Sequence, residues 1–334
     1  MAFLKMKKTL YLNMKFRVLF FLVMISSALY AQQFDVIKRY SVNYALATKG
    51  STPLLAIRSF VSGNQKYLLL VDPHKLITKI DLADGYTLSR LAMPNVMAIF
   101  KTSTYVKAID AALLNDGQLQ NAGIDHAIPK EKGIALTIDL CPSHKNLDRI
   151  IFQSLINEFK KIEQPVPLAI SVSGKWMLKH ADDLDWLKKL VEGKELNITW
   201  INHSYNHEVN NLPLSNNFLL AKDVDLAVEV LENEKLMLKN GLVPSVFFRF
   251  PGLVSDRQIV EKIVNYGLIP VGSDAWLAKG QQPNAGSIVL IHGNGNEEIG
   301  VKDFIKLLQQ QRVDAKNKQW LLFDLRAGLE SGLK

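Results

Sequence analysis

Short apolar runs alternate with amphipathic segments from residue 133 to the end of the chain. The apolar runs cover residues 133–139, 166–174, 196–202, 246–250, 268–273, 287–292 and 320–325. Segments with helical spacing separate most of them, at residues 147–162, 183–192, 218–240, 255–267 and 301–311. Unbroken apolar strands that alternate with helices are typical of a parallel sheet covered by helices. About seven such units in roughly 200 residues predict an α/β fold with a distorted (β/α)7 barrel-like domain, and an open doubly wound sheet is the alternative.

Residues 32–128 have a different rhythm, which predicts a small N-terminal β-rich accessory domain. Their β-like runs lie at 52–61, 66–72 and 75–82, and a helical pattern follows at 103–116. The turn residues Gly63 and Asn64, between the first two runs, indicate a hairpin. No constellation of reactive residues occurs in this part of the sequence. Its role could be to position a polymer, to attach the protein to the cell envelope or to form a dimer.

The first 31 residues have the pattern of a secretory signal peptide. They contain five basic residues and no acidic one, and they end in an apolar run at 18–31 that has small residues near its end. This pattern predicts export to the periplasm or the extracellular space, with cleavage after Ala28 or Ala31. The apolar run is too short to span a bilayer comfortably, so no membrane span is expected after cleavage. A buried N-terminal helix is the alternative interpretation.

Charge and cysteine content narrow the class of protein. The chain has 334 residues and a formal net charge of +8, and five of its positive charges lie in residues 1–31, which leaves +3 for the rest. This is poor support for nucleic-acid binding, since that function requires a concentrated basic face. Cys141 is the only cysteine, so no intramolecular disulfide can form and folding depends on the apolar core.

Polar side chains with catalytic chemistry follow several of the predicted strands. They are Asp139, His203, His207, Arg249, Asp274, Trp276 and His292. Parallel barrels place their catalytic groups at the carboxyl ends of the strands. Chance would scatter such groups over both ends, so their concentration predicts a catalytic face on one rim of the barrel.

His203 and His207 form the most suggestive local pattern. Histidines four residues apart lie on one face of a helical turn, so the two imidazoles could converge on one ion. Zinc accepts nitrogen ligands, and a catalytic zinc site uses three protein ligands and a water. Two unrelated surface histidines are the alternative, because the glutamate of the HExxH pattern is missing.

Three further residues have side chains with charge or proton-transfer chemistry. Arg249 ends an otherwise apolar strand, and a buried arginine requires a partner, usually a carboxylate such as Asp274. A histidine at a strand end, like His292, has a pKa suited to general acid–base catalysis. Cys141 lies three residues before His144, which would suit a thiol nucleophile, but a Cys-Pro pair in an apolar setting is more typical of inert packing.

In this order, the motifs resemble those of the polysaccharide deacetylase family, the NodB-homology domain of carbohydrate esterase family 4. The family motif Thr-Phe-Asp-Asp-Gly-Pro is matched by residues 137–142, His-Ser/Thr-x-x-His by 203–207, Arg-x-Pro by 249–251 and the final Leu-x-Ile-His-like motif by 290–292. Asp274 and Trp276 match the fourth motif, an aspartate with a tryptophan, more loosely. The resemblance implies that residues 129–334 form a distorted barrel. It also implies an enzyme that removes acetyl groups from N- or O-acetylated glycans, such as peptidoglycan-like polymers, with a divalent metal, usually zinc.

By position, the resemblance also implies a role for each matched residue. The catalytic roles fall to Asp139 as general base, His292 as general acid, Arg249, which would orient Asp139, and Asp274, which would support His292 or Arg249. The binding roles fall to His203 and His207 for the metal, and to Trp276 and Pro251 for the substrate.

Leu140 departs from the family pattern, because the family usually has its metal-binding aspartate there. Three arrangements are open: Asp139 binds the metal itself, two histidines and water hold it, or an acid such as Asp148 reaches in. The first is favoured, since three protein ligands are the common arrangement. The Asp-Leu-Cys version of the motif resembles a divergent branch of the family, so Leu140 need not mean inactivity. It also supports the competing hypothesis of a glycan-binding or scaffold protein that kept the fold and lost the chemistry.

Overall fold

The structure is a computed structural model, and it describes residues 33–333 of the chain. The predicted signal peptide, residues 1–31, lies outside the described residues. Within the described part of the chain, no helix is both long and apolar enough to cross a membrane.

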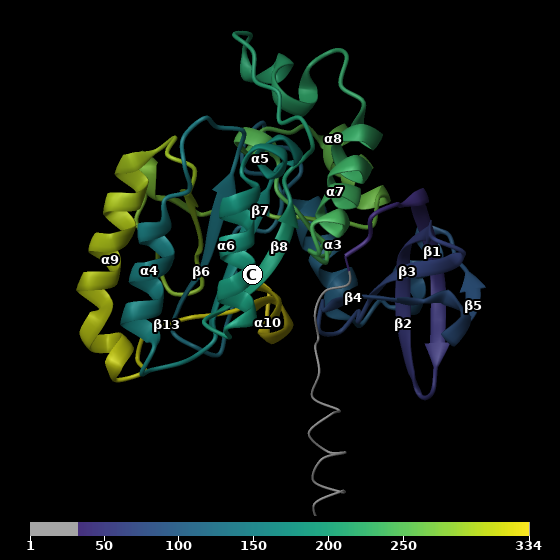
Figure 1. The fold of residues 1–334 in the computed structure, drawn as a ribbon, viewed down its shortest axis with the longest axis horizontal. Coiled ribbons are helices and arrows are strands. Elements are labelled where there is room, and N and C mark those ends of the chain that lie inside the picture. The colour runs from purple at the N-terminus through teal and green to yellow at the C-terminus, as the bar shows by residue number, and fades with distance from the viewer. Residues whose placement is uncertain (1–32, 334) are drawn as a thin grey trace, which may run out of the picture. The chain divides into compact units, whose positions relative to one another are not determined.

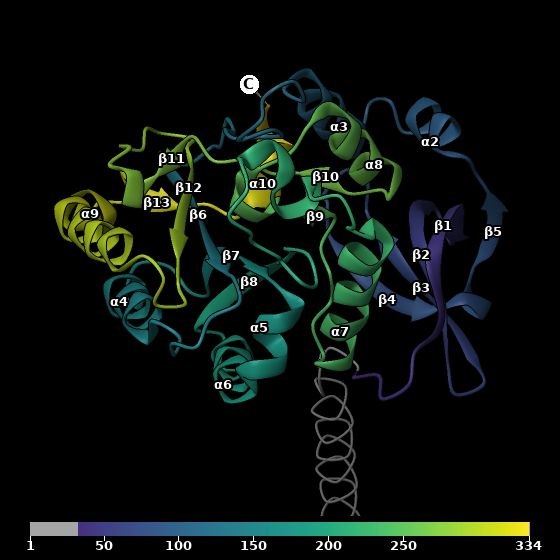
Figure 2. The same ribbon diagram turned by 90° about the horizontal axis from the view of Figure 1, so that it is seen from above.

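A parallel sheet forms the centre of the C-terminal part (Figures 1 and 2). Its strands are β6 (Gly133–Leu140), β7 (Val166–Val172), β8 (Leu196–Asn202), β9 (Phe247–Phe248), β10 (Ile269–Pro270), β11 (Ala275–Trp276), β12 (Ile288–His292) and β13 (Leu321–Leu322). The strand order is β10-β9-β8-β7-β6-β12-β11, and β13 pairs with β6. Every pair is parallel, and β6 is buried along its whole length. The predicted barrel-like α/β fold is confirmed, with β11 as a strand that the sequence pattern did not predict.

Helices pack around this sheet (Figure 2). They are α4 (Arg149–Phe159), α5 (Gly174–Lys179), α6 (Ala181–Glu192), α7 (Asn233–Lys239), α8 (Arg257–Asn265), α9 (Glu298–Lys316) and α10 (Leu325–Ser331). Ile151 and Phe152 of α4 lie in one hydrophobic core with Ile138 and Leu140 of β6. Apolar faces on helices and strands therefore cover each other, as the alternating sequence pattern predicts.

The predicted helix over residues 218–240 is only partly right. Residues Phe218–Leu220 form an isolated 3-10 turn, and the helical stretch before α7 includes a π turn at Val228–Glu232. Asp225 accepts hydrogen bonds from the backbone N–H groups of Ala227 and Val228. A side-chain oxygen that accepts from the next N–H groups marks a helix start. The helix therefore begins at Asp225 instead of continuing from Phe218.

An antiparallel sheet forms the N-terminal part. Its strands are β1 (Lys38–Lys49), β2 (Thr52–Ser62), β3 (Gln65–Val71), β4 (Thr78–Leu82) and β5 (Thr87–Arg90), in the order β4-β3-β2-β1-β5. The predicted hairpin is confirmed, because β2 and β3 pair antiparallel across Gly63, whose φ of 58° suits glycine. Helices α2 (Met93–Ile99) and α3 (Thr104–Leu114) follow, and α3 confirms the predicted helix. Strands β1 and β5 were not predicted, since few of their residues are buried and apolar.

Residues 120–127 contact the parallel sheet, although the sequence pattern assigns them to the accessory part. Isolated backbone bridges join this segment to the barrel at Gln120–Val254, Ile124–Val271 and His126–Ser287. The described chain lies within one compact unit. The domain boundary between residues 128 and 129 stays a prediction.

A buried ion pair ties strand β2 to helix α7. Arg58 and Glu234 have fully buried side chains and form two hydrogen bonds, Nε to Oε2 at 2.7 Å and Nη2 to Oε1 at 2.8 Å. The Tyr40 hydroxyl donates a third hydrogen bond to Glu234 Oε2 at 2.8 Å. Removing one partner of a buried pair is strongly destabilising, because the other charge stays buried and uncompensated.

We expect Glu234→Gln to lower the free energy of unfolding by about 3–5 kcal/mol, since Arg58 would lose its counter-charge. Glu232→Gln is the matched control, because the Glu232 side chain is 45% exposed and pairs with Lys235 near the surface. We expect that control to change the free energy of unfolding by less than about 1 kcal/mol. Urea unfolding of both variants checks the prediction, and equal midpoints for the two would contradict it.

Candidate active site

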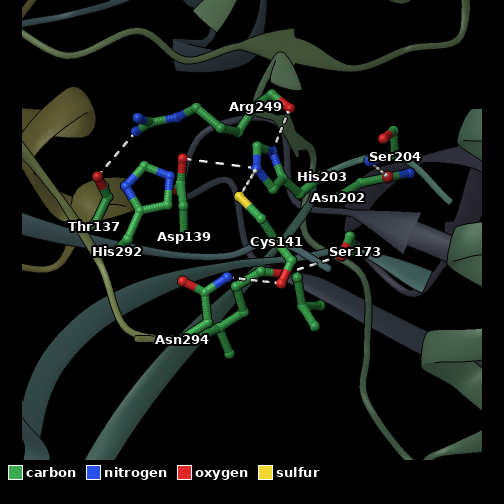
Figure 3. A network of polar contacts seen from close by, with 12 residues as sticks. Thr137, Asp139, Cys141, Ser173, Asn202, His203, Ser204, Arg249, His292 and Asn294 are labelled. Atoms are coloured by element: carbon green, nitrogen blue, oxygen red, sulfur yellow. Dashed lines mark hydrogen bonds and ion pairs between the residues drawn. The ribbon is translucent and has the colours of Figure 1, made fainter. Parts of the chain in front are cut away.

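The end of β6 decides which side chains enter the site. Successive side chains of a strand point to opposite faces. Ile138 and Leu140 lie in the hydrophobic core with α4, whereas Thr137 and Asp139 take part in the polar network on the other face (Figure 3). Leu140 is fully buried and faces away from this network. Cys141, one residue further, returns to the side of Asp139.

His203 and His207 come together on an irregular loop after β8. The prediction of a helical turn is wrong here, because Ser204 and His207 have φ values of 67° and 48°, outside the helical region. The Asn202 side chain accepts a hydrogen bond from the Ser204 N–H at 3.1 Å and holds the first turn of the loop. The two imidazole rings nevertheless lie with their centroids 4.7 Å apart. The predicted convergence of the two histidines is therefore reached through a different backbone conformation.

A backbone carbonyl fixes the tautomer of His203. The Nδ1 atom lies 2.9 Å from the carbonyl oxygen of Arg249, and a carbonyl oxygen can only accept, so Nδ1 carries the hydrogen. The Nε2 atom then offers a lone pair. It lies 3.5 Å from Cys141 Sγ and 3.7 Å from Asp139 Oδ2. Orientation of a ligating histidine by a carbonyl on its other nitrogen is the usual arrangement in metal sites.

Three buried side chains could hold a metal ion. The ligand atoms of Cys141, His203 and His207 all lie within 4.8 Å of one another, and Asp139 is not in this group. Both ring nitrogens of His207 are buried without a hydrogen-bond partner among the described residues. Burying an imidazole without a hydrogen-bond partner costs free energy unless another group, such as a metal ion, binds to its nitrogen. The residues therefore fit a divalent metal with soft or borderline character.

The Cys141 thiol lies among histidines. Burial raises its pKa, but His207, His292 and His203 together lower it more, so the pKa of Cys141 is held well below its usual range. The thiolate is the form that binds metals. The pairing with His144 that a thiol nucleophile would need is not found, since the polar contact of the exposed His144 ring is with Lys179.

Arg249 and Asp139 lie beside each other without a direct hydrogen bond. Arg249 is fully buried just after β9, and its Nη2 donates to Thr137 Oγ1 at 3.0 Å. Burial lowers the pKa of Arg249, and Asp139 and Cys141 partly offset that effect. Within the described residues, Arg249 Nε and Nη1 and Asp139 Oδ1 are buried without hydrogen-bond partners. These unsatisfied atoms would suit a water molecule or a substrate oxygen as a partner.

His292 ends β12, next to β6, and its register partner is Asp139. His292 Nδ1 lies 2.7 Å from Glu297 Oε2, and Trp276 Nε1 donates to the same oxygen at 2.8 Å. Burial lowers the pKa of His292, but Cys141, Glu297 and Asp139 raise it more, so it lies well above its usual range. Glu297 therefore orients His292 and favours its protonated form.

Glu297 contacts His292, whereas the motif implies that Asp274 supports His292 or Arg249. Asp274 Oδ2 lies 2.6 Å from His126 Nδ1 and accepts a hydrogen bond from the Ser287 hydroxyl at 3.1 Å. Both partners come from outside the motif. The sequence contained one signal for Glu297, which is a carboxylate five residues after His292. The intervening Gly-Asn-Gly-Asn stretch does not indicate that this carboxylate returns to the histidine ring.

The two residues implied to bind substrate differ in exposure. Trp276 is partly exposed beside His292, with ring centroids 5.7 Å apart, and Lys279 Nζ lies 3.9 Å from the centre of its six- and five-membered ring system. Pro251 is buried at the start of a turn, Pro251–Leu253. Their substrate-binding roles stay predictions.

Comparisons with known proteins give one family match and several similar structures. Residues 38–106 match the family described as the RP012 protein N-terminal domain. The fold is similar to a family 4 carbohydrate esterase from Bacillus anthracis, at 19% identity over 67% of this chain and 91% of that one, with a TM-score of 0.45. It is also similar to PdaA of Bacillus subtilis, a family 4 carbohydrate esterase, at 18% identity over 65% of this chain and 94% of that one, with a TM-score of 0.45.

A third similar structure is a pseudoenzyme of the same carbohydrate esterase family from Bacillus anthracis. It is 14% identical over 89% of this chain and 91% of that one, with a TM-score of 0.44. At these identities and TM-scores, function has to be inferred from the site's own residues. The chain is similar to family 4 carbohydrate esterases, described both as enzymes and as a pseudoenzyme.

Proposed function

We propose that this protein is a metal-dependent hydrolase that removes acetyl groups from an N- or O-acetylated polysaccharide. One observation carries the proposal. A buried group of metal-ligand atoms lies beside the unpaired carboxylate oxygen of Asp139 and a histidine, His292, that is held by Glu297. A ligand set, a base and an acid on one rim are the parts that metal-assisted hydrolysis requires.

His203, His207 and a third donor at the end of β6 would hold the metal. A zinc ion bound there would supply Lewis-acid polarisation of the acetyl carbonyl and would lower the pKa of a water molecule. Asp139 accepts the proton from the attacking water, because its Oδ1 atom has no other partner among the described residues. The positive charge of Arg249 lies next to this carboxylate and interacts with it electrostatically.

His292 completes the proton transfers. Its Nδ1 atom is held by Glu297, which leaves Nε2 as the nitrogen that donates a proton to the leaving amine or alkoxide. Trp276 contacts the same Glu297 oxygen, so the indole helps to hold the acid in place. Asp139 and His292 thus divide the two proton transfers between them.

We further propose that the protein is exported and acts in the periplasm or outside the cell on a peptidoglycan-like or other acetylated glycan. The support is the N-terminal sequence pattern of basic residues followed by an apolar run. The alternative function is a glycan-binding or scaffold protein without activity. Its support is Leu140, which is fully buried and carries no ligand atom at the position where the family usually has an aspartate.

Acetate release separates the two candidates. Acetylated chitooligosaccharides, acetylated xylan and peptidoglycan should be incubated with the full mature protein, with its metal content measured alongside. We expect acetate from at least one polymer and about one zinc per chain. If no polymer yields acetate with added Zn²⁺, Co²⁺ or Mn²⁺ while glycan binding is measurable, the protein is a glycan-binding or scaffold protein without activity.

A further inference from the structure

We infer that the thiolate of Cys141 is the third protein ligand of the metal, one residue after the position where the related motif has its metal-binding aspartate. This rests on the proposed function only in that both concern the same site. The inference departs from the arrangement favoured by the sequence, in which Asp139 binds the metal.

The geometry of β6 excludes residue 140 as a metal ligand. Leu140 lies in the hydrophobic core together with Ile138 and α4, on the face opposite Asp139. An added Cβ at Gly293 would lie 3.3 Å from a terminal carbon of Leu140, which shows how closely this side is packed. A carboxylate at position 140 would have to leave the strand geometry to reach the histidines. Cys141 is the next residue that returns to their side.

The observed distance between two candidate ligand atoms suits zinc. Tetrahedral zinc with a Zn–S bond of about 2.3 Å and a Zn–N bond of about 2.0–2.1 Å separates sulfur from nitrogen by about 3.6 Å. Cys141 Sγ and His203 Nε2 are 3.5 Å apart. The fixed tautomer of His203 leaves a lone pair on Nε2 that can bind the metal, because Nδ1 donates to the Arg249 carbonyl.

The backbone that carries the thiol is held from two sides. Asn294 Nδ2 donates to the Cys141 carbonyl at 2.7 Å. The Ser173 hydroxyl donates to the Leu140 carbonyl at 3.0 Å. Both contacts are visible in Figure 3, where the sulfur points toward His203. Such outer contacts fix the direction of a metal ligand.

Assigning the sulfur as ligand leaves Asp139 free for proton transfer. Asp139 is not part of the group whose ligand atoms all lie within 4.8 Å, although its Oδ2 lies 3.7 Å from His203 Nε2. A Cys-His-His site also changes the metal preference, because thiolate favours zinc over harder ions such as Mg²⁺ and Mn²⁺. The assignment therefore predicts a zinc-selective site with a separate base.

Cobalt substitution tests the assignment without relying on activity. The full mature protein should be loaded with Co²⁺, and its near-ultraviolet absorption recorded. We expect a sulfur-to-cobalt charge-transfer band, which can arise only from Cys141 because the chain has one cysteine. The band should be lost in Cys141→Ala and in Cys141→Asp, and it should persist in Asp139→Asn.

The outcomes separate this inference from the proposed function. If the unmodified protein binds one equivalent of cobalt without showing the band, the thiolate assignment is overturned. This measurement does not depend on whether any variant folds. Cobalt bound by Asp139→Asn without the band would also overturn it. A band together with no acetate from any polymer would uphold the ligand and reject the deacetylase.

Discussion

Replacing Asp139 by asparagine is expected to lower kcat for acetate release by about 10²–10⁴-fold while the zinc content stays unchanged. Asparagine keeps the size of the side chain but cannot accept a proton from the attacking water. The zinc stays because Asp139 is outside the group formed by Cys141, His203 and His207. The unpaired Oδ1 atom of Asp139 loses no hydrogen bond in the change.

Kinetics and metal analysis on the same preparation check this expectation. Asp182→Asn is the matched control, because Asp182 is exposed near the start of α6 and has no role in the proposed proton transfers. We expect the control to keep full kcat. Loss of zinc from Asp139→Asn would instead make Asp139 a metal ligand, and unchanged kcat would remove it from the mechanism.

His203→Ala is expected to reduce the zinc content from about one per chain to near zero and to abolish acetate release. The variant removes the Nε2 atom that lies 3.5 Å from Cys141 Sγ. The remaining pair, Cys141 and His207, supplies two ligands where a catalytic zinc site uses three.

Metal analysis after extensive dialysis measures this effect. His144→Ala is the matched control, since His144 is an exposed histidine shortly after β6 whose polar contact is with Lys179. We expect it to keep its zinc. A full zinc equivalent in His203→Ala would refute the position of the metal site.

The strand–helix alternation and the gathering of the candidate site residues on one rim could be predicted from the sequence, because both depend on local patterns. Strand β8 covers the predicted residues 196–202, and β6 extends the predicted 133–139 by one residue. Parallel strands placed side by side bring their ends together without further information. This suffices to place Asp139, His203 and His292 in one region.

The partners of these residues could not be predicted, because they depend on contacts between distant segments. His126 meets Asp274 across 148 residues, and nothing local marks either as the partner of the other. The loop of His203 and His207 depends on positive φ values that a helical spacing rule cannot reveal. Long-range contacts of this kind are fixed by the fold as a whole.

Cys141 is the residue whose interpretation changed most. The Cys-Pro sequence favoured inert packing, while strand alternation from Asp139 already places residue 141 on the same face. The sequence does not show where the two histidines lie in the fold, because they follow 62 and 66 residues further along the chain. The structure brings all three ligand atoms within 4.8 Å and so supplies a third donor that the motif comparison left open.

Removal and return of zinc would test the central claim most directly. Acetate release from the best polymer should be measured on one preparation as purified, after treatment with a chelator, and after addition of zinc. The claim of a metal-dependent deacetylase predicts that acetate release falls to background with the chelator and returns with about one equivalent of zinc. Acetate release that persists at full rate after the metal has been removed would contradict it.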